Sequence, residues 1–211
     1  MKIHPAILVT KPTDLIIQIS DLIEVTKDFD IDIIDWQRTN TSTISVEQAL
    51  EIKGELNLHF DLMCDHVLDK ISLLVKEPRV KSIIITLDTL DDISEAFDII
   101  HHHGKRAGLS INPDKKLFEF SVYLNDIDIL QIFSIEPGAQ GQPFLEERLE
   151  LTNQVKEMGF KGQIEIDGGV NKKTIPILKQ YPIDILSVGS ALSKATNPQE
   201  TFLDLQKLIS D

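Results

Sequence analysis

Cysteine, aromatic residues, basic charge and long apolar runs are all scarce in this sequence. A single cysteine, Cys64, excludes an intramolecular disulfide and fits a reducing compartment. Lys and Arg number 21 against 34 Asp and Glu, and a net charge of −13 argues against nucleic acid or an anionic membrane surface as partner. No apolar run approaches a membrane span, and Pro5 and Lys11 interrupt the short N-terminal one. We therefore expect a cytoplasmic protein without a signal peptide.

Short β-branched runs alternate with helix-like segments along the whole chain. The expected strands are Ile3–Val9, Ile31–Trp36, Leu56–Met63, Lys81–Leu87, Arg106–Ile111, Ile127–Ile135, Gly162–Asp167 and Ile183–Gly189. Helical periodicity follows them, with Thr13 and Ser45 as candidate N-caps. Eight strand–helix units predict a single (β/α)₈ TIM barrel domain over residues 1–211. A doubly wound sheet also alternates its elements, but it rarely needs eight parallel strands.

Three aspartates lie at the ends of predicted strands. Asp35 ends "IDIID", Asp61 follows "LHF", and Asp167 ends "IEID". Because the site of such a barrel lies at the C-terminal ends of its strands, we expect these carboxylates to converge at one mouth. Three clustered carboxylates need a cation or added protons to share their charge. For any one of them alone, a solvent-exposed Asp capping its strand is an equally good interpretation.

Glycines gather in the loops after the sixth, seventh and eighth predicted strands. They are Gly138 and Gly141 in "EPGAQGQPF", Gly168 and Gly169 in "DGGVN", and Gly189, before Ser190, in "VGSAL". Glycine allows backbone N–H groups to approach a ligand closely. The loops after strands 7 and 8 of barrels commonly bind phosphate with a helix N-terminus. The three loops together predict a phosphate site built from backbone donors, which suits an acidic protein.

The same motifs resemble the ribulose-phosphate 3-epimerase family over nearly the whole chain. "SIEPGAQGQPF", "IEIDGGVN" and "VGSAL" are similar to its loops after strands 6, 7 and 8, and "HPAILVT" and "GLSINP" to its strands 1 and 5. The resemblance implies a homo-oligomeric barrel that acts on a small-molecule sugar phosphate. Two aspartates on opposite faces of the substrate would move the C3 proton through an enediolate, and the matching positions are Asp35 and Asp167. Met63 is retained from the family's substrate site.

The family's metal site is altered in this chain. The resemblance implies a divalent metal held by two aspartates and two histidines, and Ile33 and Asp61 occupy the histidine positions. The remaining candidate ligands, Asp35, Asp61 and Asp167, are hard oxygen donors that prefer magnesium or manganese to zinc. We expect either no metal or a weakly bound divalent cation. His59, one layer deeper than Asp61, is interpreted as a hydrogen-bonded interior histidine.

Three functions remain open from the sequence. The first is a 3-epimerase of ribulose 5-phosphate, xylulose 5-phosphate or a related ketose phosphate. The second is a phosphate-binding-barrel lyase, but the Asp-x-Lys-x-x-Asp pattern of those enzymes meets Asp61-Leu62-Met63-Cys64-Asp65, which has no lysine. The third is a barrel that binds a sugar phosphate without turning it over, in line with the lost histidines.

Overall fold

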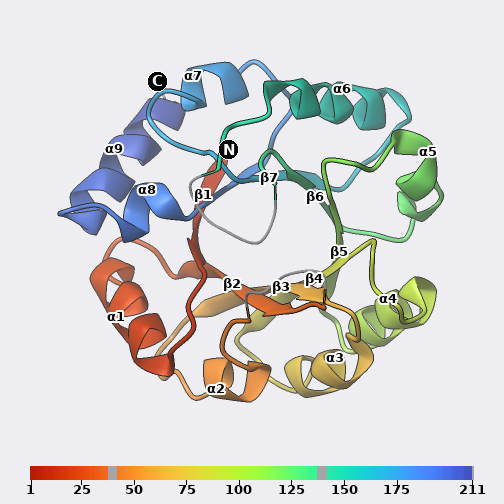
Figure 1. The fold of residues 1–211 in the computed structure, drawn as a ribbon, viewed down its shortest axis with the longest axis horizontal. Helices are drawn as coiled ribbons and strands as arrows, with labels where there is room; N and C mark the ends of the chain where they lie inside the picture. Colours follow the sequence, from red (N-terminus) through yellow and green to blue (C-terminus); the bar gives the residue numbers. More distant parts are fainter. Residues whose placement is uncertain (38–41, 137–141, 211) are drawn as a thin grey trace.

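Eight parallel strands close into one barrel in the computed structural model (Figure 1). The strands are β1 (Lys2–Ile7), β2 (Asp28–Asp35), β3 (Asn57–Cys64), β4 (Val80–Thr86), β5 (Arg106–Ile111), β6 (Ile129–Phe133), β7 (Gln163–Asp167) and β8 (Ile185–Val188). Each strand pairs with its neighbours in sequence, and β8 closes the barrel on β1. The predicted (β/α)₈ TIM barrel is confirmed.

Helices surround the barrel as an outer ring (Figure 1). They are α1 (Pro12–Leu22), α2 (Val46–Leu50), α3 (Leu68–Leu74), α4 (Ile93–His102), α5 (Leu117–Phe120), η1 (Ser121–Tyr123), η2 (Glu146–Leu149), α6 (Glu150–Glu157), α7 (Ile175–Leu178), α8 (Ser190–Ser193) and α9 (Pro198–Ser210). The structure describes residues 1–37, 42–136 and 142–210. Within these ranges no helix is long and apolar enough to span a membrane.

The expected helix starts agree with the structure at one of two positions. Ser45 caps α2 by accepting a hydrogen bond from the Gln48 backbone N–H, as predicted. The start of α1 was placed two residues late, because the helix begins at Pro12 and its N-cap is Lys11 rather than Thr13. Proline suits the first helical position, where its missing N–H costs no hydrogen bond.

The strands have a buried outer face and a buried inner face, and β2 shows how they differ. Phe29, Ile31 and Ile33 belong to the main hydrophobic core, which packs the barrel against its helices. Asp30 and Asp32 alternate with them and are buried inside the barrel, at 3% and 5% exposure. Polar residues on the inner face made β2 look shorter in the sequence than it is: the strand begins at Asp28, three residues before the predicted start at Ile31.

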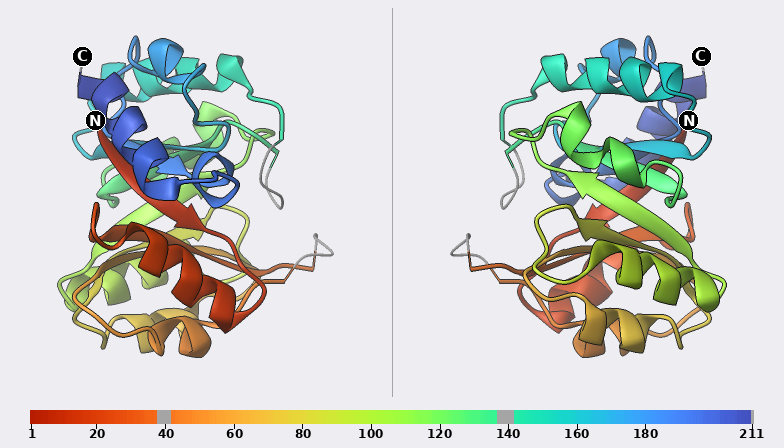
Figure 2. Two further views of the ribbon diagram at one scale, coloured as in Figure 1. Left: turned by 90° about the vertical axis from the view of Figure 1, so that its left-hand side faces the viewer. Right: turned by 90° about the vertical axis from the view of Figure 1, so that its right-hand side faces the viewer.

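The inside of the barrel is unusually polar at its middle level. Its buried polar side chains include His4, Asp30, Asp32, His59, Asp61, Ser82, Ser110, Gln131, Glu165 and Ser187. All eight strands are parallel, so their C-terminal ends, which carry the site, lie at the same end of the barrel. The side views of Figure 2 show the start of β1 beside the end of α9, at the opposite end. We call the end of the barrel where the strands begin the foot, and the opposite end the mouth.

Candidate active site

Asp32, Asp61 and Asp167 form an acidic cluster inside the barrel. Asp32 on β2 is in register with Asp61 on β3, so the two carboxylates lie at the same level. Asp167 ends β7, and its charge raises the pKa of both other carboxyl groups. Asp61 and Asp167 therefore lie near enough to interact, and Asp32 is the third member of the cluster.

Burial is the largest cause of the raised pKa values in the cluster. It raises the pKa of Asp32 well above the ordinary value, and the charges of Asp167 and Asp61 add to the effect. Burial and the charges of Asp167 and Asp30 do the same for Asp61. The pKa of Asp167 rises to about 7, again mainly through burial and then through Asp30. Near neutral pH the cluster therefore holds protons, which an acid–base catalyst needs.

Asp30 lies deeper in the barrel than the acidic cluster, and its charge affects all three members. Its charge raises the pKa of Asp32, Asp61, Asp167 and the buried Glu165 on β7. The Asp30 carboxylate is held by two partners: His4 Nδ1 lies 2.9 Å from Oδ1, and Ser187 Oγ donates to Oδ2 at 2.7 Å. Both oxygens of this buried carboxylate therefore have a hydrogen-bonding partner.

Asp61 is the member of the cluster whose polar atoms lack partners. Both of its carboxylate oxygens are buried with no close hydrogen-bonding partner among the described residues, and only the side chain of Gln131 acts to lower the pKa of Asp61, against the larger effect of burial. An unpaired buried carboxylate is costly unless it takes up a proton or binds a cation. Asp32, Asp61 and Asp167 together offer only oxygen ligands, a donor set that fits magnesium or manganese better than zinc.

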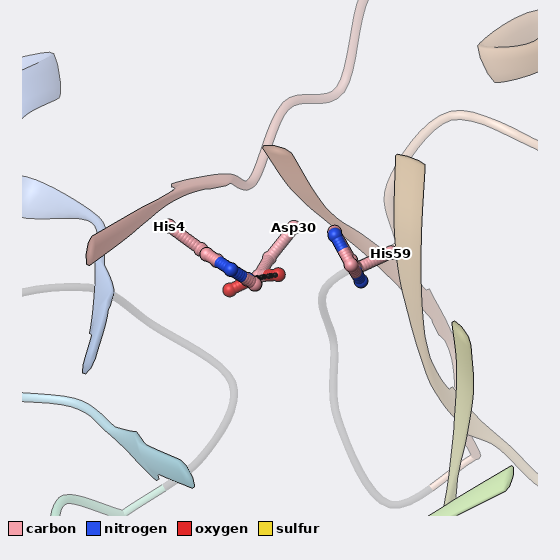
Figure 3. Close-up of side chains that lie close together, drawn as sticks. All are labelled: His4, Asp30 and His59. Carbon is pink, nitrogen blue, oxygen red and sulfur yellow. Dashed lines mark hydrogen bonds and ion pairs between the residues drawn. The ribbon is translucent and has the colours of Figure 1, made fainter. Parts of the chain in front are cut away.

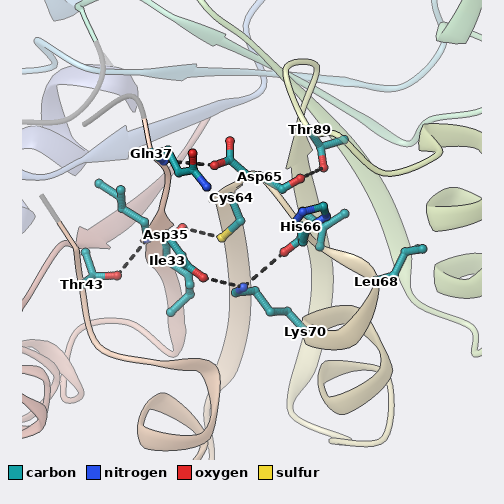
Figure 4. Close-up of polar contacts among 12 residues, drawn as sticks. Ile33, Asp35, Gln37, Thr43, Cys64, Asp65, His66, Leu68, Lys70 and Thr89 are labelled. Atoms are coloured by element: carbon teal, nitrogen blue, oxygen red, sulfur yellow. Dashed lines mark hydrogen bonds and ion pairs between the residues drawn. The ribbon is translucent and has the colours of Figure 1, made fainter. Parts of the chain in front are cut away.

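Asp35 does not join the acidic cluster, and this corrects the sequence-based site. Its carboxylate lies on the outside of the barrel, where Lys70 of α3 donates to Oδ2 at 2.9 Å (Figure 4). The Asp35 side chain is 72% exposed, and its neighbour on β3 is Cys64, not Asp61. Asp35 therefore cannot share a substrate or a metal ion with Asp167 in this conformation, although both lie near the same end of the barrel.

Strand periodicity explains why Asp32, and not Asp35, belongs to the acidic cluster. Successive side chains of a strand point to opposite faces, so Asp32 and Asp35, three residues apart, face opposite ways. In the sequence, Asp35 was chosen as a site residue because it ends the strand. The alternation of aspartates in "DFDID" instead indicates that the Asp30 and Asp32 side chains point to the inner face of the barrel. For the same reason Ile33, assigned to a ligand position from the sequence, lies in the outer core at 1% exposure.

An apolar layer covers the acidic cluster on the mouth side. Ile34, Met63 and Phe133 follow the inner-face residues of β2, β3 and β6 by two positions and pack with Trp36 as a separate buried cluster. Met63, predicted to contact substrate, is 3% exposed there. This layer shields Asp32 and Asp61, which are 5% and 1% exposed, from water and so strengthens the interaction of their charges, whereas Asp167 at the end of β7 is only partly buried.

His59 is an interior histidine, as the sequence suggested. Its Nδ1 lies 2.7 Å from Ser82 Oγ and its Nε2 lies 3.3 Å from Asp28 Oδ1. The ring stacks on that of His4, with the centroids 4.5 Å apart (Figure 3). The pair lies one layer deeper than Asp61, so neither imidazole belongs to the acidic cluster.

The predicted phosphate loops lie side by side at the mouth. Asp167 of β7 pairs with Ser187 of β8, so Gly168 and Gly169 leave their strand beside Gly189 and Ser190. Gly168 and Gly169 have φ of 104° and 67°, in the region that favours glycine. A Cβ at Gly168 would lie 2.3 Å from Ile135 Cγ1, which also excludes other residues. Gly138 and Gly141 lie outside the described residues.

We expect a sulfate or phosphate ion to bind between these two loops. The ion would contact backbone N–H groups near Gly168, Gly169, Gly189 and Ser190, with α8 directing its first turn toward it. Crystals grown with sulfate test this, and Gly168→Ala should lose the ion because the added methyl group displaces Ile135. A clear anion elsewhere and none between the two loops would contradict the assignment.

Solved structures of other proteins share the fold of this chain. Among solved structures, a 3-hexulose-6-phosphate synthase from Salmonella typhimurium aligns with a TM-score of 0.73 at 14% identity, covering 100% of this chain and 99% of that one. KGPDC from Streptococcus mutans aligns with a TM-score of 0.72 at 12% identity, covering 99% and 97%. At such identities these likenesses establish the fold.

Relatives identified by sequence establish the family as well as the fold. The ribulose-phosphate 3-epimerase of Chlamydia pneumoniae is 27% identical over 202 residues, covering 92% of this chain and 88% of the relative. That of Mycobacterium tuberculosis is 33% identical over 197 residues, covering 76% and 85%. The model of the ribulose-phosphate 3-epimerase family matches residues 2–193. The chain therefore belongs to the ribulose-phosphate 3-epimerase family.

Proposed function

We propose that this protein epimerises a ketose phosphate at C3, with Asp32 and Asp167 as the two proton-transfer groups. The observation that carries the proposal is the buried acidic cluster, in which the pKa of Asp167 is raised to about 7. Inversion of a carbon by proton exchange needs a base on one face and an acid on the other. Two carboxyl groups with raised pKa values, on β2 and β7, supply such a pair near neutral pH.

The reaction conserves the number of protons on the pair. One carboxylate removes the C3 proton, the C3–H electrons pass into the enediolate, and the other carboxylic acid returns a proton to the opposite face. The two aspartates exchange roles for the reverse reaction. The resemblance of the "DGGVN" and "VGSAL" loops to phosphate loops supports a phosphorylated substrate, whose phosphate would lie beside Gly168 and Gly189.

A divalent cation at the acidic cluster would take its oxygen ligands from Asp32, Asp61 and Asp167. These side chains would have to approach one another first, because among the described residues only His4, Asp30 and His59 already have ligand atoms within 4.8 Å of one another. When bound, such an ion supplies positive charge that stabilises the negative oxygens of the enediolate. Asp61 is the strongest candidate ligand because both its oxygens are buried and have no close hydrogen-bonding partner among the described residues. Magnesium or manganese suits this set, as the sequence led us to expect.

A second candidate function is a sugar-phosphate-binding barrel without turnover. The altered ligand set favours it, because the buried imidazoles of His4 and His59 stack on each other and lie within hydrogen-bonding distance of Asp30 and Asp28, outside the acidic cluster. The lyase alternative has less support, since position 63, where those enzymes would carry a lysine, holds the buried Met63.

An NMR assay of epimer formation distinguishes these functions. Wild-type protein incubated with ribulose 5-phosphate should produce xylulose 5-phosphate, and magnesium or manganese should increase the rate. Binding of the ketose phosphate with no epimer at high protein concentration would favour the binding barrel. Formation of formaldehyde or carbon dioxide from a hexulose or gulonate phosphate would favour a lyase instead.

A further inference from the structure

His4, Asp30 and His59 form a compact group of ligand-type side chains inside the barrel (Figure 3). One ligand atom from each lies within 4.8 Å of the others, and all three residues are buried. They come from β1, β2 and β3, so three neighbouring strands fix their positions. Among the described residues this is the group of histidine, cysteine and acidic side chains whose spacing suits a metal ion.

The ligand types differ from those of the acidic cluster above. Two imidazoles and one carboxylate are typical of zinc and similar borderline ions, which usually take a water molecule as the fourth ligand. Two ligands at about 2.0–2.1 Å from a tetrahedral ion lie about 3.3 Å apart. The 2.9 Å contact of His4 Nδ1 with Asp30 Oδ1 needs to open by only a few tenths of an ångström when an ion replaces the shared proton.

Outer partners hold these side chains in the way that metal ligands are commonly held. Ser187 Oγ donates to Asp30 Oδ2 at 2.7 Å, which leaves Oδ1 for an ion. Ser82 Oγ lies 2.7 Å from His59 Nδ1. The Nε2 of His59 has the longer contact, 3.3 Å to Asp28, and is the nitrogen most easily released to an ion.

One member of the group, His4, borders a cavity at the foot of the barrel, on the side away from the active site. The cavity has a volume of about 620 Å³, and His4 and Asp28 line it together with the start of β1 and residues of α9 such as Phe202. Charge also favours a cation at this level, because Asp30 lies below the buried carboxyl groups of Asp32 and Asp61.

We propose that His4, Asp30 and His59 form a second metal site, which binds one zinc ion or a similar borderline divalent cation at the foot of the barrel. The site is distinct from the oxygen-ligand cluster of Asp32, Asp61 and Asp167. Its test does not depend on the proposed catalytic function, since metal binding at these residues requires neither substrate nor turnover. Its role is to tie β1, β2 and β3 together beneath the active site.

Zinc titration of the chelator-treated protein tests the site without substrate. We expect one tightly bound zinc ion per chain and a rise in Tm on zinc addition. His4→Gln and His59→Gln should each weaken zinc binding by at least about 100-fold, and Ser187→Ala by about 10–100-fold, as for other outer-shell partners. The matched control is His101→Gln, which removes an exposed histidine paired with Asp128 at 3.0 Å and should leave zinc binding unchanged.

Cobalt substitution gives a second readout that does not depend on variants folding. Cobalt bound by two imidazoles, one carboxylate and water should give the intense visible bands of a tetrahedral site, and Asp61→Asn should retain them. Three results would each overturn the proposal: no zinc or cobalt binding by wild type, binding unchanged in folded His4→Gln, or loss of binding in Asp61→Asn alone. The last would assign the ion to the mouth.

Discussion

Asp32→Asn and Asp167→Asn should each lower kcat of the epimerase by about 10²–10⁴-fold, the usual contribution of a general acid or base. Asparagine keeps the size of the side chain but can neither accept nor deliver the C3 proton. Steady-state kinetics with ribulose 5-phosphate, supported by circular dichroism to confirm folding, measure the effect. We expect KM to change much less than kcat, since the phosphate loops are untouched.

Asp35→Asn is the matched control for these two variants. It removes a carboxylate from the same strand, but that carboxylate is 72% exposed and pairs with Lys70 on the outside of the barrel. An exposed ion pair contributes only about 0–1 kcal/mol, so folding should be preserved. Activity of Asp35→Asn should stay within about fivefold of wild type. A loss in Asp35→Asn as large as in Asp32→Asn would contradict the site, as would full activity in Asp32→Asn.

The free energy of unfolding should fall as the pH rises from about 4 to 7. The folded pKa values of Asp32, Asp61 and Asp167 lie above their unfolded values, so the unfolded chain releases protons first as the pH rises. For Asp167 the rise of the pKa from 3.8 to about 7 changes the free energy of unfolding by several kcal/mol across this pH range, at about 1.4 kcal/mol per pKa unit.

Two groups outside the acidic cluster also affect the pH dependence. His4, whose pKa is raised by Asp30 against the opposing effect of burial, contributes in the same direction. Asp28 opposes the trend only at lower pH, because hydrogen bonding from His59 lowers its pKa to about 2.

Denaturant unfolding at pH 5 and pH 8 measures this dependence. Wild-type protein without metal should be more stable at pH 5, whereas many globular proteins show little change across this range. Asp61→Asn should raise stability at pH 8 because it removes a buried unpaired charge while retaining the shape of the side chain. Magnesium or manganese at millimolar concentration should also restore stability at pH 8 in wild type. Equal stability at both pH values, with no gain in Asp61→Asn, would show that the carboxylates are not buried together.

The barrel could be predicted from sequence because its outer face is regular. Residues such as Ile31 and Ile33 pack against helices, and each strand presents an apolar face of this kind between helical segments. The inner face could not be deduced in the same way. It combines polar side chains from all around the barrel, and no single strand shows which of them meet. Asp61 and Asp167 were found because each ends an apolar stretch on the inward-facing side of its strand.

The remaining parts of the site depend on contacts that are distant in sequence. Asp30 meets Ser187 across a separation of 157 residues, and His4 meets Asp30 across 26. Neither contact has a local signal, although the alternation of "DFDID" indicates which aspartates share a face. His59 was recognised as an interior histidine from its position two residues before Asp61, but its stacking partner, His4, could not be foreseen.

The origin of the C3 hydrogen in the product is the most direct test of a two-aspartate mechanism. Ribulose 5-phosphate would be incubated with wild-type protein in heavy water and followed by NMR during the first tenth of the reaction. If Asp32 and Asp167 act on opposite faces, the xylulose 5-phosphate formed should carry deuterium at C3 while the remaining ribulose 5-phosphate keeps its original hydrogen. Product that retains the substrate hydrogen at C3, or the absence of any exchange, would contradict the mechanism.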